Sequence, residues 1–314
     1  MKLSKREHTD IASAVGPEKG IALLAEIFEA IGFDIKDEES YNLLAEHTDR
    51  TGERSSVYRG DATLHGRCWK LGEGLEVRSV LYEAGQELYY ADCRPAFRGR
   101  YVHKISPWEM AEYCEDGEAV VRGVLAGGRE ILFELQNLTE VKPNMLRSAQ
   151  LRVGLAGLAC SVHVEGNPDP GPIRPAHPKA DPKPNPGRRS EAGFAENLLL
   201  GNGLTPASRL AEYAEEACEN DYLIRGCVLA WRELHNPITG GRLVWMYVDA
   251  NDIRLELLAS RRCVEGRLQI GATISATAWL QGHFLEEGEV SARYEGVDPD
   301  FVKGDFWALL RKTN

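Results

Sequence analysis

The 314-residue chain lacks the signatures of the common enzyme and metal-binding classes. No GxxxxGK[ST] or GxGxxG phosphate-binding loop follows a predicted strand, so nucleoside-triphosphate and dinucleotide chemistry have no support. There is no CxxC pair, and no cysteine–histidine pair has zinc-finger spacing. The sequence therefore predicts no metal, no cofactor and no catalytic residue.

Long hydrophobic runs and an apolar leader are also missing. No stretch approaches the ~18 apolar residues of a membrane-spanning helix, and the N-terminal MKLSKREHTD is polar. The seven cysteines are odd in number and widely spaced, which is typical of reduced thiols used as small hydrophobic side chains. We expect a cytoplasmic protein with no membrane partner.

Positive charge is in deficit. The chain has 37 Lys and Arg against 48 Asp and Glu, which gives a net charge of −11. Such a balance repels polyanions at long range and disfavours a general nucleic-acid coat, although it leaves room for a short basic site. The composition favours a protein partner, whose identity the sequence does not give.

Residues 1–104 predict an α+β region. Pro17 opens a segment with apolar residues at helical spacing, and a shorter helix is expected over 37–47. From about Ser55 the hydrophobic period changes to two, which is typical of antiparallel strands joined by Gly-containing turns. The expected strands are ATLHGRCWKLG, GLEVRSVLYEAG and QELYYADC.

Two later segments resemble each other. Ser106-Pro107 matches Thr205-Pro206, and Val121-Arg122-Gly123 matches Ile224-Arg225-Gly226. Ser or Thr before Pro is typical of a helix start, so we expect a short helix at each place, followed by strands. The sequence therefore predicts one small β-module used twice.

The last predicted strand of the second copy, GRLQIGATISATAWLQGHF, is similar to strands of OB-fold barrels. The resemblance covers about 60 to 80 residues of each copy and implies a small five-stranded barrel. Another small β-barrel or a sandwich is the alternative. Because the first copy is short of strands, a copy could complete its barrel with borrowed strands, and residues 62–92 are the expected lenders.

The predicted fold is thus α+β: an N-terminal helix plus antiparallel strands, followed by two related small β-barrel (OB-like) modules. Eight of the 15 prolines fall between Pro168 and Pro186, which is typical of an extended linker or surface strap. The predicted units are 1–104 (α+β region), 105–167 (first module), 168–190 (linker), 191–290 (second module) and 291–314 (tail with a short helix).

Two sets of residues are candidates for binding. The segment RPAFRGRYVHK interleaves cations for phosphates with rings for bases. Strand aromatics and two alignable histidines of the modules could form a second binding face, although aromatics also suit a core. The candidates are Arg94, Phe97, Arg98, Arg100, Tyr101 and Lys104 in the first set, and Trp231, Trp245, Tyr247, Trp279, His163 and His283 in the second.

These observations favour a non-enzymatic binding or scaffold protein with an unknown protein partner. The first alternative is a single-stranded nucleic-acid-binding protein that uses the 94–104 basic and aromatic patch together with the OB-like faces. The second alternative is an uncharacterised enzyme, for which Cys93 beside Asp92, with His103 as a base, is the only nucleophile arrangement that the sequence offers.

Overall fold

Most of the described residues lie in strands. The computed structural model describes residues 2–5, 24–142, 145–165, 202–207, 220–251 and 253–285. The predicted linker 168–190 and the predicted tail 291–314 lie outside the described residues. Within the described ranges, no helix has both the length and the apolar character needed to cross a bilayer.

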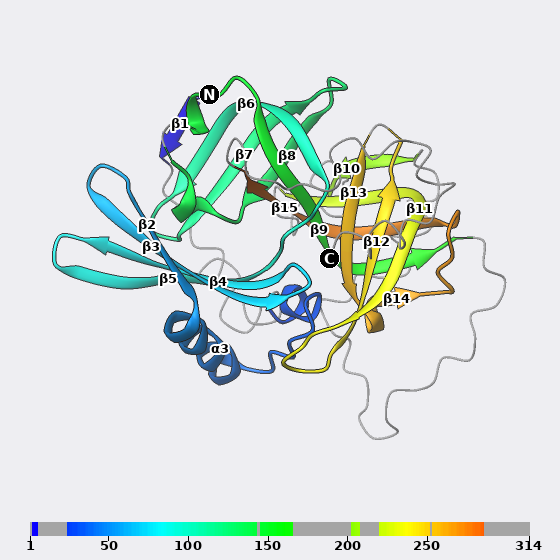
Figure 1. Cartoon of the computed structure of the whole chain (residues 1–314), viewed down its shortest axis with the longest axis horizontal. Helices are drawn as coiled ribbons and strands as arrows, with labels where there is room; N and C mark the ends of the chain where they lie inside the picture. Colours follow the sequence, from blue (N-terminus) through cyan, green and yellow to red (C-terminus); the bar gives the residue numbers. More distant parts are fainter. Residues whose placement is uncertain are drawn as a thin grey trace, which may run out of the picture.

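The strands form one sheet of 11 strands and one of four strands (Figure 1). The four-stranded sheet contains, in spatial order, β2 (Glu53–Tyr58), β3 (Ala62–Gly72), β4 (Leu75–Ala84) and β5 (Glu87–Phe97). The larger sheet contains β1 (Lys2–Lys5), β6 (Val102–Tyr113), β7 (Glu118–Leu125), β8 (Glu130–Leu135), β9 (Leu151–Val164), β10 (Gly203–Pro206), β11 (Asp221–His235), β12 (Arg242–Asp249), β13 (Arg254–Ser260), β14 (Val264–Glu265) and β15 (Thr273–Phe284). Short 3-10 helices are η1 (Leu138–Glu140), η2 (Met145–Arg147) and η4 (Arg261–Cys263).

The helix α3 (Glu38–Thr51) has clear start and stop signals. The Asp37 carboxylate accepts the Ser40 N–H at 2.8 Å, and the Ser40 hydroxyl accepts the Asp37 N–H at 3.1 Å, so the first turn is capped reciprocally. The chain leaves the helix at Gly52, whose N–H donates to the Thr48 carbonyl. The helix lies where the sequence predicts one, and with β2–β5 it forms an α+β N-terminal region.

The long strands β9 and β15 organise the larger sheet. They pair antiparallel, from Val164 opposite Ile274 to Val153 opposite Phe284. The other edge of β9 pairs first with β6 and further along with β13. The other edge of β15 pairs first with β11 and then with β8. Each long strand therefore runs through two rings of strands, one after the other.

These pairings close two five-stranded rings. Ring 1 is β6-β7-β8-β15-β9 and returns to β6, whereas ring 2 is β11-β12-β13-β9-β15 and returns to β11. In each ring the third strand pairs parallel with the long strand of the other half of the chain. The first strand of each ring also has a bulge, at Trp108 in β6 and at Leu229 in β11. The rings are thus related by an exchange of β9 and β15.

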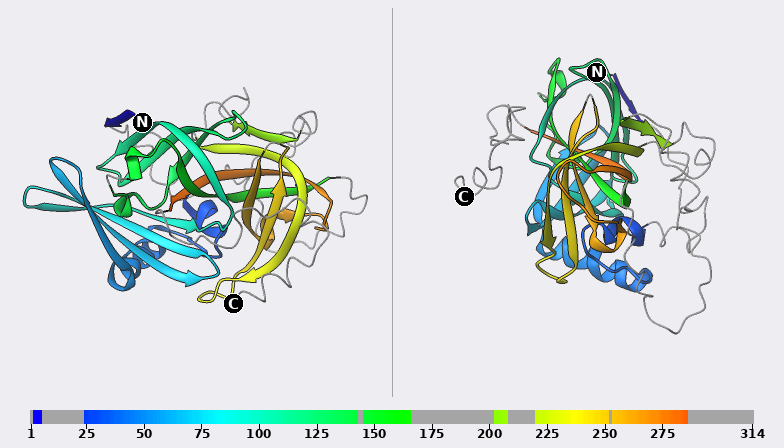
Figure 2. Two further views of the ribbon diagram at one scale, coloured as in Figure 1. Left: turned by 45° about the horizontal axis from the view of Figure 1, so that its top comes forward. Right: turned by 90° about the vertical axis from the view of Figure 1, so that its right-hand side faces the viewer.

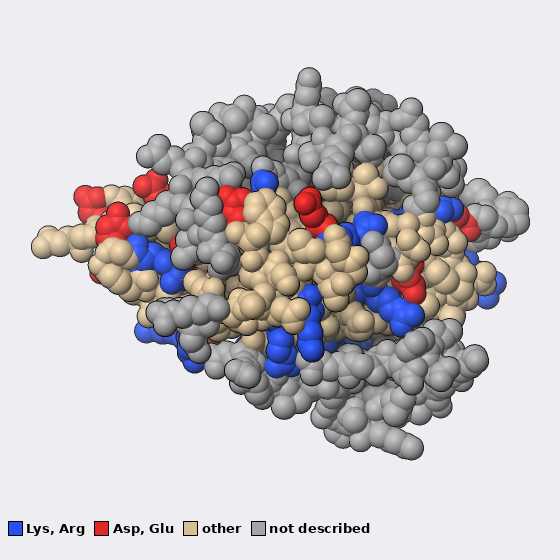
Figure 3. Space-filling model, turned by 90° about the horizontal axis from the view of Figure 1, so that it is seen from above, with Lys and Arg blue, Asp and Glu red and all other residues tan. Residues whose placement is uncertain are grey.

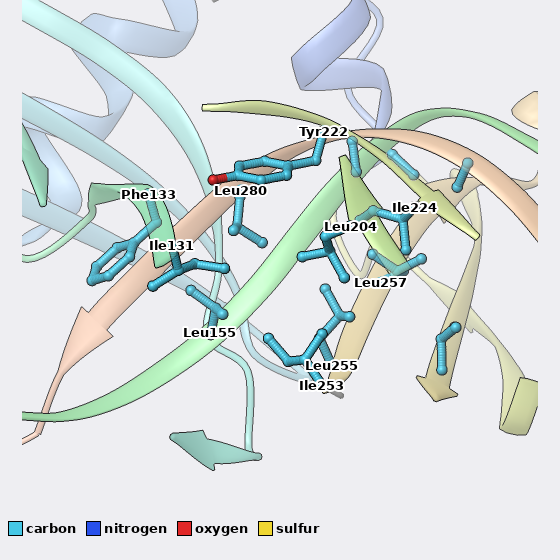
Figure 4. Close-up of a cluster of buried hydrophobic side chains, with 14 of the residues drawn as sticks. Ile131, Phe133, Leu155, Leu204, Tyr222, Ile224, Ile253, Leu255, Leu257 and Leu280 are labelled. Atoms are coloured by element: carbon cyan, nitrogen blue, oxygen red, sulfur yellow. The ribbon is translucent and has the colours of Figure 1, made fainter. Parts of the chain in front are cut away.

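The two rings share one continuous hydrophobic core. Figure 4 shows buried side chains of β8, β9, β11, β13 and β15 meeting around the long strands. Tyr222 of β11 reaches from ring 2 to ring 1, where its hydroxyl accepts the N–H of Leu132 at 3.0 Å. Because buried side chains contact one another across the boundary, we expect the rings to fold as one unit.

The predicted helix at Ser106-Pro107 is wrong, because these residues lie in β6. Pro107 lies next to the bulge, where a missing N–H is tolerated, and opposite Gly123. A Cβ on Gly123 would stand 2.6 Å from the Ile105 Cγ2 and 3.2 Å from the Pro107 Cα, so glycine allows β7 to approach this part of β6 closely. In the second copy, Thr205 and Pro206 end the strand β10, and the helix expected after them falls outside the described residues.

Each ring is completed by a strand from the other half of the chain, but the prediction that residues 62–92 supply these strands is wrong. Ring 1 takes β15 and ring 2 takes β9, whereas residues 62–92 form the separate four-stranded sheet. The sequence matches also align β7 with β11, although the strand order makes β6 the counterpart of β11. The recurring Arg-Gly pattern therefore lies on strands with different places in the two rings.

The N-terminal region lies against both rings (Figure 2). An apolar cluster joins it to the outer face of ring 2, where Phe97 packs in one group with Trp245 and Leu258. A polar network joins it to ring 1, where the buried Arg78 of β4 donates to the Gln136 carbonyl at 3.2 Å. The turns at the far end of the four-stranded sheet project beyond the rings (Figure 1).

Replacing Gly282 with alanine should destabilise the junction of the two rings. A Cβ at this position of β15 would lie 2.2 Å from the ring of Phe133, which is fully buried in β8. We expect a loss of about 1–3 kcal/mol in the free energy of unfolding, measured by urea denaturation. Gly127→Ala is the matched control, because no atom lies within 4 Å of its added Cβ. Equal unfolding midpoints for the two variants would contradict the close packing at this junction.

Candidate functional site

Large exposed hydrophobic side chains gather at the projecting end of the four-stranded sheet. Half of those in the described chain lie here: Tyr58 on β2, and Leu88, Tyr89 and Tyr90 on β5. The exposed fraction of Leu88 is 59% and that of Tyr89 is 50%. Figure 3 shows acidic and basic side chains among uncharged ones at this end of the molecule, on the left. Clustering of this kind marks a contact surface more often than scattered single residues do.

The hairpin that carries these residues fixes the direction of their backbone groups. Gly85, at φ +65°, and Gln86 form the two-residue turn between β4 and β5, so the flanking pair Ala84–Glu87 is hydrogen-bonded. Since hydrogen-bonded and open positions alternate, Leu88 and Tyr90 direct their N–H and C=O groups away from β4. No described residue pairs with these four groups. We call residues 87–90 of β5 the open edge.

Further along β5 the same edge is closed by side chains. The Tyr41 hydroxyl of α3 donates to the Cys93 carbonyl at 3.2 Å and accepts the Cys93 N–H at 3.1 Å. Pro95 has no N–H, and its carbonyl accepts the side-chain amide of Gln281 at 3.0 Å. The same Gln281 accepts the Phe97 N–H at 3.2 Å. These side chains replace a neighbouring strand, so the unpaired backbone is confined to the open edge.

A carboxylate cluster surrounds Arg94 at the inner end of the open edge. The guanidinium donates to Glu134 of β8, to the Gly117 carbonyl at 2.6 Å and to Asp92 at 2.7 Å. The carboxylate of Glu118 lies 4.0 Å from the same guanidinium. Buried arginine paired with several carboxylates holds β5 against ring 1 in one geometry. We use the name carboxylate cluster for Asp92, Glu118 and Glu134.

One guanidinium does not neutralise this cluster. Loss of hydration, followed by the neighbouring Glu134 carboxylate, raises the pKa of Glu118 to about 8, and Arg94 opposes this shift. Burial likewise raises the pKa values of Asp92 and Glu134 against the effect of Arg94. A third of the Glu118 side chain stays exposed (33%), so water offsets part of its shift. The cluster therefore keeps a proton on Glu118 near neutral pH, because one guanidinium does not balance three ionised carboxylates.

The predicted basic and aromatic patch at 94–104 is not assembled. Arg94 and Phe97 are buried and lie on opposite faces of β5, one in the carboxylate cluster and one in the apolar cluster against ring 2. Arg98, Arg100 and Tyr101 are half-buried, and only Lys104 is exposed. The backbone N–H groups of Arg100 and Tyr101 both donate to the buried carboxylate of Glu256. Strand alternation separates residues that are neighbours in sequence.

The second predicted binding face is also mostly covered. Trp245 and Tyr247 are buried because the N-terminal region packs on this side of ring 2, and Trp231 and Trp279 are half-buried against the two cores. The Trp245 N–H donates to Glu256 at 2.9 Å. The two histidines differ, because His163 is half-buried, with 42% of its side chain exposed, and His283 is buried. Stacking of bases on Trp245 or Tyr247 would require the N-terminal region to move away.

The nucleophile arrangement at Cys93 is not assembled either. Burial and the Asp92 carboxylate raise the pKa of the Cys93 thiol to about 12, so the thiolate is not populated near neutral pH. Burial lowers the pKa of His103 to about 4. Among the described residues, no group of three or more His, Cys, Asp and Glu side chains is arranged to hold a metal ion.

The open edge is not among the binding residues that the sequence predicts. The sequence signal for this edge is the pair Tyr89-Tyr90, which comes shortly after a glycine turn. Polar and apolar residues alternate only weakly in this segment, so burial of its side chains is not expected. Burial supports this, since Glu87–Tyr90 are all exposed whereas the following residues of β5 are increasingly buried. Paired aromatics beside a tight turn therefore indicate a surface, whereas basic residues further inside the strand do not.

Removing the Glu118 carboxylate should flatten the dependence of stability on pH. The unfolded Glu118 loses its proton at the ordinary glutamate pKa of about 4.3, whereas the folded group holds it toward pH 8. Between these values the folded state binds more protons, so this group makes stability fall as pH rises. In Glu118→Gln we expect a smaller fall in the urea midpoint between about pH 5 and about pH 8.

Glu115→Gln is the matched control for this measurement, because Glu115 is an exposed carboxylate in the same turn. It should keep the pH dependence of the unchanged protein. A Glu118→Gln protein that loses stability with rising pH as steeply as the unchanged protein would show that the crowding of Glu118 does not affect folding.

No family model, no curated protein and no solved structure matches this chain. A function must therefore be argued from the chain's own geometry. The described residues offer an open edge with two outward-facing residues, exposed aromatic side chains on that edge, and a carboxylate cluster at its inner end.

Proposed function

We propose that this chain is a non-enzymatic binding protein that holds a partner chain as an added strand along β5. One observation carries the proposal: the backbone groups of Leu88 and Tyr90 point outward without a partner in the described chain, on an edge that exposes large hydrophobic side chains. An added strand gains main-chain hydrogen bonds from such an edge. The side chains that alternate along it supply contact area and selectivity.

The side chains of the open edge suit an extended partner. Leu88 and Tyr90 lie on one face of β5, and Tyr89 lies on the other, where its ring is 6.4 Å from that of Tyr82. A partner strand would thus meet apolar contacts on both of its faces. Tyrosine rings add such area at low cost in conformational entropy, because few torsions become fixed.

The rings act in this proposal as the scaffold that holds β5. We further propose that each ring is an OB-like barrel, which is supported by closure of five strands in a non-consecutive order. The carboxylate cluster and Gln281 of ring 1, together with Tyr41 of α3, hold the inner half of β5. A fixed edge binds an added strand with little loss of conformational freedom of its own.

Leu88→Pro should abolish strand addition while preserving the fold. Proline removes the outward N–H of Leu88 but leaves the hydrogen bonds of Glu87 and Tyr89 to β4 in place. Peptides selected from a random ten-residue displayed library against the unchanged protein should bind Leu88→Pro at least ~10-fold more weakly. Bound peptide should also slow amide hydrogen exchange at Leu88 and Tyr90, and not at residues that already pair with β4.

Two controls separate backbone pairing from other effects. Leu88→Ala keeps the N–H and should retain part of the affinity, and Ile238→Ala, an exposed residue in the β11–β12 turn, should retain all of it. Peptides that bind Leu88→Pro as tightly as the unchanged protein would contradict the proposal. Exchange protection elsewhere, or a library that yields no binding peptide, would contradict it equally.

A further inference from the structure

Carboxylates border the open edge at both ends. At the turn, Glu87 is exposed, and Glu83, opposite Leu88, keeps 45% of its side chain exposed. At the inner end, Asp92 follows on β5 itself, and Glu118 begins β7 directly after the β6–β7 turn, where Gly117 lies against Ala91 of β5. A strand placed on the open edge would therefore lie between two acidic groups.

Two basic side chains near the open edge, His65 and Arg94, already have carboxylate partners. His65 lies 2.6 Å from Glu83 at the turn end. At the inner end Arg94 is buried and divides its donors among Asp92, Glu134 and the Gly117 carbonyl. Asp116 adds further negative charge, which is felt at both Asp92 and Glu118. Among the described residues, the surroundings of the open edge thus hold more carboxyl groups than basic side chains.

The closure of β5 at Cys93 limits how an added strand can continue. Pairing with Leu88 and Tyr90 is open, but the Tyr41 hydroxyl already fills the backbone groups of Cys93. A partner strand must therefore leave the sheet beside Asp92. At that point a long side chain of the partner lies next to Asp92 and to the exposed part of Glu118.

We infer that the partner segment is extended and basic, with Lys or Arg facing the acidic groups at both ends of the open edge and apolar residues between them. This inference rests on the proposed function, because it names the chemistry of the strand that β5 would hold. Basic side chains gain from the exposed carboxylates at the turn end, and beside Glu118 they favour release of the proton that its raised pKa retains, whereas acidic side chains would be repelled. The apolar residues between them cover Leu88, Tyr89 and Tyr90.

A second copy of this chain is a poorer occupant of the same edge. Antiparallel pairing of β5 with itself places the turn end of one copy beside the inner end of the other. Both ends are acidic, so Glu87 of one copy would approach the carboxylate cluster of the other. Like charges placed opposite each other across paired strands are destabilising. Charge complementarity therefore favours a basic partner over self-association.

Two labelled synthetic peptides test the inference. Both have a core of alternating valine and threonine; one has two lysines at each end, and the other has two glutamates at each end. We expect the lysine peptide to bind at least ~10-fold more tightly at low salt, and the difference to shrink as salt is added. The double variant Glu87→Gln with Glu118→Gln should lower the lysine-peptide affinity several-fold and keep the exchange protection at Leu88 and Tyr90. Glu265→Gln, which changes an exposed carboxylate on β14, should leave the affinity unchanged.

The outcomes distinguish this inference from the function on which it rests. If both peptides bind equally and Leu88→Pro abolishes both, strand addition stands and the basic partner is wrong. If neither peptide binds and no protection develops at Leu88 and Tyr90, the proposed function itself fails. A concentration-dependent dimer that Leu88→Pro dissociates would show that a second copy covers the edge, and would overturn the inference.

Discussion

The antiparallel pairing of β9 with β15 is the constraint on which the rest of the structure depends. These two strands come from different halves of the chain, and each completes the ring that the other half begins. The same strands also carry contacts to the N-terminal region. Ala156 and Leu158 of β9 belong to its apolar cluster, and Gln281 of β15 closes part of the β5 edge. A change in the β9–β15 register would therefore misplace both rings and the four-stranded sheet at once, since a one-residue slip exchanges the two faces of a strand.

The two rings hold the N-terminal region by different chemistry. Ring 2 offers an apolar outer face, where Trp245 and Leu258 are buried under the N-terminal residues. Ring 1 contributes an ion pair, in which the Glu134 carboxylate of β8 binds the Arg94 guanidinium of β5. Apolar burial supplies stability without a fixed direction, whereas a desolvated ion pair costs hydration but tolerates few alternative geometries. Together the two contacts position β5. The apolar face of ring 2 holds the four-stranded sheet, and the Arg94–Glu134 ion pair holds β5 against ring 1.

Local sequence patterns predict individual helices and strands in this chain, but they do not predict which distant strands pair. The change of hydrophobic period near Ser55 predicts β3, β4 and β5, and the Asp37–Ser40 capping residues agree with α3. Ser106-Pro107 is misleading because Ser-Pro begins helices and also fits a bulged strand, and only the facing Gly123 decides between them. The basic patch is misleading because a linear reading ignores strand alternation, which places Arg94 and Phe97 on opposite faces. The exchange of β9 and β15 cannot be read from one half of the chain, since each half alone is short of one strand.

The two halves of the β5 edge differ in how their outward backbone groups are covered, and this difference supports the proposed binding role of the open edge. Over Cys93–Phe97 the edge is closed by a hydroxyl, a proline and a side-chain amide, so exposed backbone is avoided there with three separate devices. Over residues 87–90 the part of the chain that the structure describes supplies only Glu87, together with the bulge at the following Ala91, and the positions between them carry leucine and tyrosine. Large hydrophobic side chains on an unpaired edge invite pairing with any extended chain, which acidic residues at both ends would restrict to basic ones. An edge that is open, apolar and bordered by one sign of charge is therefore better explained as a selective surface than as an unprotected one.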